Sequence, residues 1–179
     1  MHPKREKKRE QTRQQIISGL LELMLEKPYA EITVKELCKQ AKVSRMTFYR
    51  NFHTKEEVIE GQFAMVYATF IQRLVAQKRF AFYDVATTFF TLIKENQLMM
   101  EALVQNNLTN LLLDALTNYV KTLIEQQILI TREQSSHFLV AMISGGLTEV
   151  IVVWTKNGMQ EPVEELVLFA SKYMHLKTN

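Results

Sequence analysis

The sequence has few residues that interrupt helices and almost none that form covalent cross-links. It contains five Gly and three Pro among 179 residues, too few for a protein built from many tight turns, so we expect long helices. The one cysteine, Cys38, excludes an intrachain disulfide and a cysteine-rich zinc site. Hydrophobic residues nevertheless make up 47% of the chain and charged residues 23%, which is enough apolar material to bury a core.

Signals for export and for a membrane span are also lacking. The residues that follow Met1 are charged and have no apolar stretch of signal-peptide type behind them. The longest apolar run, Phe138 to Trp154, includes Glu149 and is shorter than a membrane span requires. We therefore expect a soluble, cytoplasmic protein.

Positive charge is concentrated in the first third of the chain. Residues 1–60 hold 13 Lys and Arg against 9 Glu, whereas residues 61–179 hold 9 against 10 Asp and Glu. A basic N-terminal segment on a nearly neutral body indicates an anionic partner for that end of the molecule alone.

Apolar residues recur at helical spacing along most of the chain, and the sequence shows no convincing strand pattern or internal repeat. Pro28 ends the first expected helix because proline has no N–H for the helix ladder. Asn157-Gly158 suits a helix end, and Pro162 suits the first turn of the last helix. The sequence thus predicts an all-α fold, with helices at about 4–27, 33–41, 45–52, 54–74, 84–96, 98–105, 108–127, 131–156 and 162–174.

Several of these helices begin with recognisable capping residues. Residues 33–36, 54–57 and 131–134 each have Thr followed three positions later by Glu or Gln, the spacing of a capping box. Residues 42–44 form a short turn, and Ser44 is suited to cap the helix that follows. The spacing predicts two short helices joined by a three-residue turn.

This pair of helices is strongly basic. Residues 33–55 hold six Lys and Arg and one acid, Glu36. Two short helices of this kind, the second polar and basic on its outer side, describe a helix-turn-helix. An arginine can donate two parallel hydrogen bonds to O6 and N7 of one guanine. A threonine can contact the methyl group of thymine with its own methyl group, or a phosphate with its hydroxyl. A solvated basic face on an ordinary helical bundle is the alternative that charge and periodicity leave open.

Residues 32–58 closely resemble the DNA-binding segment of the tetracycline-repressor (TetR) family. Ala41-x-Val43-Ser44, Phe48-Tyr49 and Lys55-Glu56-Glu57 fall at the spacing of that family. The resemblance implies that the third helix reads DNA, with Arg45 and Arg50 facing bases. It implies phosphate contacts for Thr33, Thr47, Tyr49 and Lys55. The full set of DNA-binding residues that we expect is Thr33, Ser44, Arg45, Met46, Thr47, Tyr49, Arg50, His53 and Lys55.

The segment departs from the family pattern at three positions. Lys42 stands where the family usually has Gly, and a left-handed backbone there would cost a non-Gly residue on the order of 1 kcal/mol. Met46 also replaces a common Gly. Cys38 replaces a small Ala, and we expect it to serve packing rather than redox sensing.

Residues 144–166 resemble, less specifically, the helix pair through which members of this family form a dimeric four-helix bundle. Gly145 and Gly146 lower helicity but permit close approach of another helix. A twofold dimer would place two recognition helices in successive major grooves, roughly 34–36 Å apart. The dimer-interface residues that we expect are Gly145, Gly146, Val150, Val153, Val163, Leu166, Val167 and Ala170.

An effector pocket is a further implication of the resemblance, because the C-terminal domain of this family is regulatory. Met and aromatic residues at helical spacing form a core more often than a ligand site, so packing remains an alternative for each of them. The candidate lining residues are Phe63, Tyr67, Phe70, Phe89, Phe90, Met99, Met100, Leu103, Phe138, Met142 and Trp154.

The expected protein has a DNA-binding domain at residues 1–55 and an effector-binding and dimerisation domain at residues 56–179. It would repress transcription from a palindromic double-stranded DNA operator as a homodimer, and an effector would release it through the helix that starts at Thr54. In the main alternative, the C-terminal domain binds a partner protein, as in an activator or co-regulator. A small helical enzyme is disfavoured because the four His are scattered and no catalytic residues, metal ligands or cofactor motif can be identified.

Overall fold

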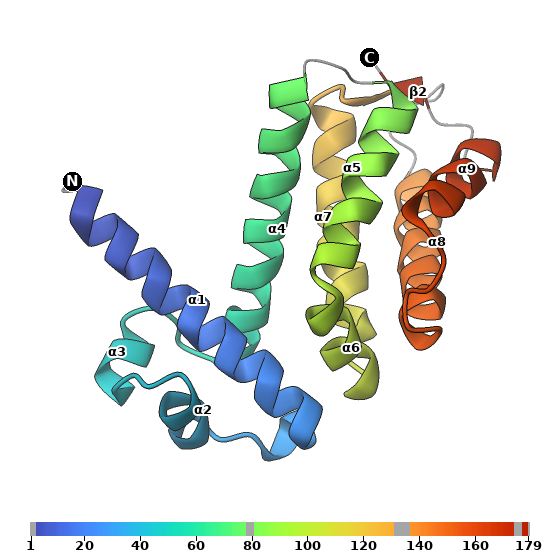
Figure 1. Cartoon of the computed structure of the whole chain (residues 1–179). Coiled ribbons are helices and arrows are strands. Elements are labelled where there is room, and N and C mark those ends of the chain that lie inside the picture. Colours follow the sequence, from blue (N-terminus) through green and yellow to red (C-terminus); the bar gives the residue numbers. More distant parts are fainter. Residues whose placement is uncertain (1–2, 78–80, 131–136, 174–176, 179) are drawn as a thin grey trace. The chain divides into compact units, whose positions relative to one another are not determined.

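The computed structural model describes residues 3–77, 81–130, 137–173 and 177–178. The chain forms two compact units, Met1–Ala64 and Met65–Asn179, and the boundary between them falls within the helix α4. Figure 1 shows that helices account for nearly all of the described chain. The all-α class predicted from the periodicity is therefore confirmed.

The first unit contains three helices, a 3-10 turn and the start of α4. These elements are α1 (Pro3–Glu26), η1 (Tyr29–Glu31), α2 (Val34–Gln40), α3 (Arg45–Tyr49) and α4 (Lys55–Gln77). The helix α1 ends two residues before Pro28, as expected. The helix α1 packs against α2, and α2 packs against α3. The largest fully buried side chains of this unit are Ile16, Leu20, Met24, Ile32, Leu37, Phe48, Phe52 and Ile59.

The caps predicted at Thr33, Ser44 and Thr54 form, the last with a variation. Thr33 and Glu36 make a complete capping box at the start of α2, and the Ser44 side chain accepts from the Thr47 N–H at the start of α3. At α4 the Thr54 hydroxyl accepts from the Glu57 N–H, but the Glu57 carboxylate accepts from His53 N instead of Thr54 N. The helix α3 is shorter than the expected range to residue 52.

The second unit is built from the rest of α4 and five further helices. These are α5 (Phe82–Glu95), α6 (Gln97–Gln105), α7 (Thr109–Glu125), α8 (His137–Lys156) and α9 (Val163–Tyr173). The helix α8 packs against α7 and α6, and α9 packs against α5. Gly158 has a left-handed φ of 68°, which fits the predicted end of α8. The capping box expected at residues 131–134 and the predicted end of the last helix at Met174 lie outside the described residues.

Two very short strands were missed by the sequence analysis. Leu129–Ile130 (β1) pairs antiparallel with Lys177–Thr178 (β2), so that Leu129 lies opposite Thr178. Two residues are too few for an alternating pattern to be visible in a sequence. The pair joins the end of the chain to the segment after α7 without changing the fold class.

The helix α8 is longer than the apolar run considered above. With 20 residues and a mean hydropathy of 1.8, it is long and apolar enough, on length and composition alone, to cross a membrane. The core helix of a soluble protein passes the same test. Part of α8 is buried within the second unit, where Ile143, Ile151 and Trp154 are almost inaccessible to solvent.

Candidate nucleic-acid interface and helical hairpin

The helix α3 buries one side and exposes the residues that were predicted to read DNA. Phe48 is fully buried, whereas Met46 is 82% exposed and Tyr49 51% exposed. Arg45 and Arg50 are exposed as well. The ring of Phe48 packs edge-on against Tyr49, with 5.2 Å between centroids. The structure therefore brings these four side chains together on the outer side of one short helix.

The hydroxyl groups at the start of α3 hold the helix in shape. Ser44 Oγ accepts from Thr47 N at 3.0 Å and lies 2.9 Å from Thr47 Oγ1. Arg50 Nη2 donates to the same Thr47 hydroxyl at 3.4 Å. Ser44 and Thr47 thus have an internal role beside any contact with a phosphate. His53 is exposed, and its backbone N–H donates to Glu57.

Thr33 belongs to a second network, centred on Glu36. The Glu36 carboxylate accepts from Lys27 Nζ at 2.6 Å and from both the backbone N–H and the hydroxyl of Thr33. These bonds, with that from Lys27 the strongest, lower the pKa of Glu36 to about 2. The network links the end of α1 to the start of α2. The spacing of Thr33 and Glu36 in the sequence predicted the cap, but it did not predict the ion pair between Lys27 and Glu36.

Lys55 lies in the first turn of α4 and is tied to the segment between α1 and α2. Its ammonium donates to the Tyr29 carbonyl at 2.8 Å and to the Ile32 carbonyl at 2.6 Å. It also lies 4.2 Å from the centroid of the Tyr29 ring, whose hydroxyl donates to Glu56 at 2.8 Å. Since an ammonium has three donors, one remains for a phosphate.

Arg13 is a positioning residue that the sequence analysis missed. Its guanidinium donates to the Asn51 carbonyl at 3.0 Å and lies 4.2 Å from the centroid of the Phe52 ring. A Cβ added at Gly61 would come within 2.9 Å of this guanidinium, so glycine there makes room for it. Arg13 therefore holds the end of α3 from a position 38 residues away, where no local sequence signal exists.

Two of the departures from the family pattern have a structural explanation. Lys42 has a φ of 53°, so the turn before α3 keeps the left-handed backbone that was expected, with a residue other than Gly. Cys38 is 5% exposed, and burial raises the pKa of its thiol. A buried thiol of raised pKa favours the packing role over a reactive one.

Most of the residues proposed to line an effector pocket lie in the core of the second unit. Tyr67, Phe70 and Phe89 belong to one apolar cluster. Tyr67 also stacks on Tyr119, with 4.1 Å between ring centroids and 7° between planes. The Tyr67 hydroxyl is buried and finds no hydrogen-bond partner among the described residues, and burial raises the pKa of Tyr67. Others of the set, each at most 3% exposed, are Phe90, Met99, Met100, Leu103 and Trp154. Phe63 is buried in the first unit.

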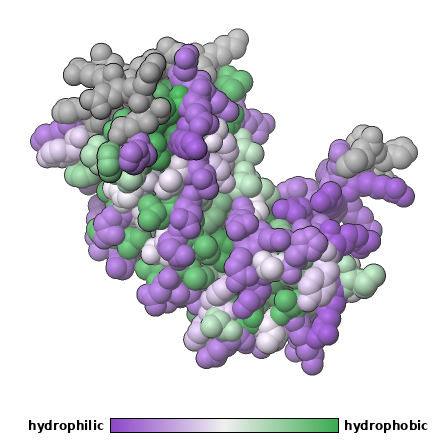
Figure 2. Space-filling view, turned by 180° about the vertical axis from the view of Figure 1, so that it is seen from behind, coloured by the Kyte–Doolittle hydropathy of each residue, from purple (hydrophilic) through white to green (hydrophobic). Residues whose placement is uncertain are grey.

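Phe138 and Met142 require a correction. They are 73% and 67% exposed, because they lie on the solvent-facing side of α8, with Met142 half a turn away from the fully buried Ile151. Within a single chain they therefore do not line an internal pocket. Figure 2 shows apolar residues reaching the surface in patches among hydrophilic ones on the face drawn.

The proposed dimer residues divide between the surface and the core. On α8, Gly146 and Val153 are exposed, and Gly145 and Val150 are half-buried. On α9, Val163 is half-buried. Its neighbours Leu166, Val167 and Ala170 are buried in the single chain, on a helix that packs against α5. The exposed residues of α9 include Leu168 at 60% and Phe169 at 51% exposure.

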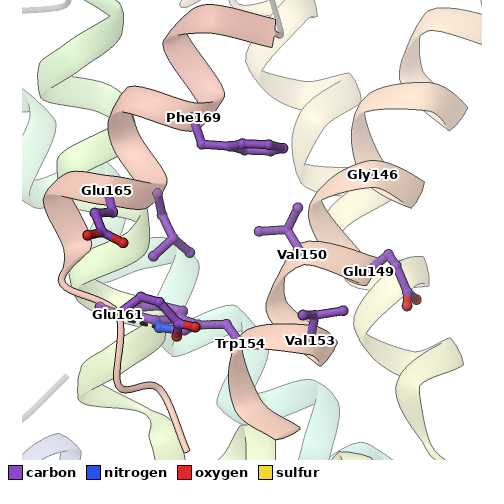
Figure 3. Close-up of a pocket in the computed structure, with 9 residues that line it drawn as sticks. Gly146, Glu149, Val150, Val153, Trp154, Glu161, Glu165 and Phe169 are labelled. Atoms are coloured by element: carbon purple, nitrogen blue, oxygen red, sulfur yellow. Dashed lines mark hydrogen bonds between the residues drawn. The ribbon is translucent and has the colours of Figure 1, made fainter. Parts of the chain in front are cut away.

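A groove of about 440 Å³ lies between α8 and α9 (Figure 3). Phe169 projects from α9 across it toward Gly146 and Val150. Trp154 forms part of its floor and donates from Nε1 to the Glu161 carbonyl at 3.2 Å. The other lining residues are Glu149, Val153, Glu161, Glu165 and Leu166. Among the described residues, no group of three or more His, Cys, Asp or Glu could hold a metal ion.

A basic helix-turn-helix followed by a helical bundle defines the class of DNA-binding transcription regulators. Comparison with family models agrees: residues 16–61 match the bacterial regulatory proteins of the tetR family, and residues 81–176 match a transcriptional regulator C-terminal region. The chain belongs to the TetR family of transcriptional regulators, as the resemblance of residues 32–58 indicated. No curated protein matches the sequence.

Several solved structures share the fold of this chain. Lin0861 from Listeria innocua superposes with a TM-score of 0.75 at 19% identity, over 91% of this chain and 88% of that one. A TetR transcriptional regulator from Streptococcus agalactiae 2603V gives 0.63 at 17% identity, over 92% and 94%. The dihydroxyacetone kinase operon activator DhaS gives 0.59 at 17% identity, over 93% and 98%.

Proposed function

We propose that the protein is a repressor that binds an operator of twofold symmetry as a homodimer. The observation that carries this proposal is the outer side of α3, where Arg45, Met46 and Tyr49 are exposed on a helix anchored by the buried Phe48. Exposed arginines on such a helix suit contacts with base edges in a major groove. We assign base contacts to Arg45 and Arg50.

Phosphate contacts are assigned to residues at the start of α2, at the start of α4, and in and directly around α3. They would fix the position of the helix on the duplex and carry no sequence information. Two of the three ammonium donors of Lys55 bond to carbonyls of the described chain, which leaves the third for this purpose. The other members of this set are Thr33, Ser44, Thr47, Tyr49 and His53, with Met46 next to the bases.

The exposed side of α8 supports a homodimer. A Cβ added at Gly145 or Gly146 would meet no atom within 4 Å, so packing within the chain does not require glycine at either position. Each glycine costs the helix about 0.5–1 kcal/mol relative to alanine. Close approach of a second chain accounts for both, and the exposed Phe138, Met142 and Val153 lie along the same helix. Such an apolar surface is typical of an interface.

Regulation is proposed to act by a population shift. An effector bound in the second unit would favour an arrangement in which the two recognition helices no longer match the operator. The buried Tyr67 hydroxyl, which has no hydrogen-bond partner in the described part of the chain, offers one polar contact for such a ligand. The helix α4 contains residues of both units and would carry the coupling, typically about 1–3 kcal/mol.

Activation through a partner protein is the second candidate. DhaS, which shares the fold, is named as an operon activator. The tight packing around Phe90, Met99 and Leu103 also favours a solid core over a ligand cavity. Under this proposal, the exposed apolar surface of the second unit would receive the partner.

Gel-shift titration against fragments of the host genome tests DNA binding, and a reporter driven by the recovered site separates the two candidates. Reduced transcription in the presence of the protein supports the repressor, and increased transcription supports the activator. Absence of any preferred fragment at moderate ionic strength would refute operator binding.

A further inference from the structure

The exposed face of α9 carries a self-complementary order of side chains. In a helix that turns about 100° per residue, four outward residues fall within an arc of roughly 100°. These residues are Glu165, Leu168, Phe169 and Lys172. Along the helix they give an acid, two exposed apolar residues and a base. Among the described residues, no ion pair is made by Glu165 or Lys172.

The groove beside this face is acidic. Three of its lining residues are glutamates, and none is Lys, Arg or His. One carboxylate oxygen of Glu161 is buried and has no hydrogen-bond partner within the described chain. Lys94 lies 5.8 Å from the centroid of the Trp154 ring, but it forms no ion pair with these acids. A partner surface that brings apolar side chains and a positive charge would complement the groove.

A second copy of the same chain supplies that surface. A twofold contact is reciprocal, so whatever one copy offers, the other receives. If the two α9 helices pack antiparallel, the twofold axis falls between Leu168 and Phe169, midway between the acid and the base. Each Lys172 then faces Glu165 of the second copy, and the apolar residues meet at the centre.

We propose that Glu165 and Lys172 form this reciprocal ion pair, twice in each dimer, and that the second copy's α9 covers the acidic groove (Figure 3). The proposal rests on the homodimer proposed above and adds the residues that set its register and its choice of partner. It explains why an apolar surface bordered by carboxylates would not repel its own copy.

Charge reversal tests the pair. Glu165→Lys alone and Lys172→Glu alone each place like charges opposite one another at both contacts. Each should raise the dissociation constant of the homodimer by about tenfold or more. An equimolar mixture of the two variants restores opposite charges at both contacts, so it should form a heterodimer. The double variant E165K/K172E should dimerise about as well as the wild type. Native mass spectrometry of chains tagged to different masses, with sedimentation velocity, measures all four.

Glu164→Lys is the matched control. Glu164 is the exposed neighbour of Glu165, and it does not line the groove. The control changes the net charge as much as Glu165→Lys does, and it should leave the homodimer intact. Circular dichroism should show the same helix content for all variants, because each substituted side chain is exposed.

The outcomes separate the pair from the dimer itself. If the wild type stays monomeric at all concentrations, the proposed homodimer is wrong. If the wild type dimerises but the mixed variants show no preference for the heterodimer, the ion pair is wrong and the homodimer stands. Recovery in the mixture and in the double variant, with no effect of Glu164→Lys, supports the pair.

Discussion

The ammonium of Lys55 donates to the Ile32 carbonyl at 2.6 Å and thereby joins the first turn of α4 to the segment that precedes α2. A second bond, to the Tyr29 carbonyl, strengthens this connection. A lysine that the family pattern marks as a phosphate contact therefore also holds the helix-turn-helix against the start of α4.

Lys55→Met should affect both folding and DNA binding. Loss of two charge-assisted hydrogen bonds at a partly buried site should destabilise the first unit by about 1–3 kcal/mol. Loss of the phosphate contact should reduce the salt dependence of DNA binding by about one ion per half-site. Thermal unfolding and binding at several salt concentrations measure the two effects.

Tyr29→Phe, which keeps the ammonium, should leave the salt dependence unchanged. An unchanged salt dependence in Lys55→Met would assign Lys55 to the internal role alone.

Arg45→Ala should relax the preference for one base position in each half-site. The expected loss is about 1–3 kcal/mol at that position if the guanidinium contacts guanine as a fork. Binding to a set of operators with single base changes measures it. Lys39→Ala removes an equal charge from the exposed side of α2 and should weaken all sequences alike. A uniform loss for Arg45→Ala would make Arg45 a phosphate contact.

Lys42→Gly should stabilise the protein and weaken its DNA binding. Glycine adopts the left-handed backbone at this position without strain, but it also makes the unfolded chain more flexible. The net effect should raise the free energy of unfolding by about 0.5–1 kcal/mol. The lost charge should lower affinity for all DNA. Gln127→Gly, at another left-handed position, should stabilise without changing DNA affinity. Chemical denaturation and DNA titration of both variants provide the check, and a destabilised Lys42→Gly would refute the strain.

Glu36 should make stability depend on pH in the acid range. Its pKa falls from 4.5 to about 2 on folding, chiefly through the bond from Lys27. A lowered folded pKa means that the contribution is complete above about pH 4.5 and is lost as the pH falls through about 2. The stability difference between the wild type and Glu36→Gln should therefore shrink over that interval. An NMR titration of the Glu36 carboxyl with a midpoint near 4.5 would contradict the network.

Gly146→Ala should separate the stability of the chain from its association. Because the site is open, alanine should stabilise α8 in the monomer by about 0.5–1 kcal/mol. The same methyl group should weaken the dimer if a second helix approaches there. Sedimentation equilibrium at several concentrations measures the association. Unweakened dimerisation would place the close approach elsewhere.

Local signals in the sequence predicted the helix-turn-helix well. The caps at Thr33 and Ser44, the end of α1 before Pro28 and the left-handed Lys42 all depend on interactions within a few residues. Contacts between residues that are far apart in the sequence have no such local pattern. Arg13 reaches Asn51, and Lys55 reaches Tyr29 and Ile32, through the tertiary fold alone.

The orientation of apolar helices was the other limit. The helix α8 is apolar nearly all round, so periodicity could not show that Phe138 and Met142 face outward while Trp154 faces inward. On α9, the residues expected at a dimer interface include Leu166, Val167 and Ala170, but these side chains are buried within the chain. The apolar face of a helix that stays exposed for a partner depends on which of its faces are covered by other helices of the same chain.

Selection of binding sites from a random double-stranded DNA library, followed by measurement of the mass of the complex, tests the central claim most directly. The account predicts an enriched inverted repeat bound by two copies of the chain, and loss of the enrichment in Arg45→Ala. Enrichment of no sequence, or of a single unrepeated site bound by one copy, would contradict it.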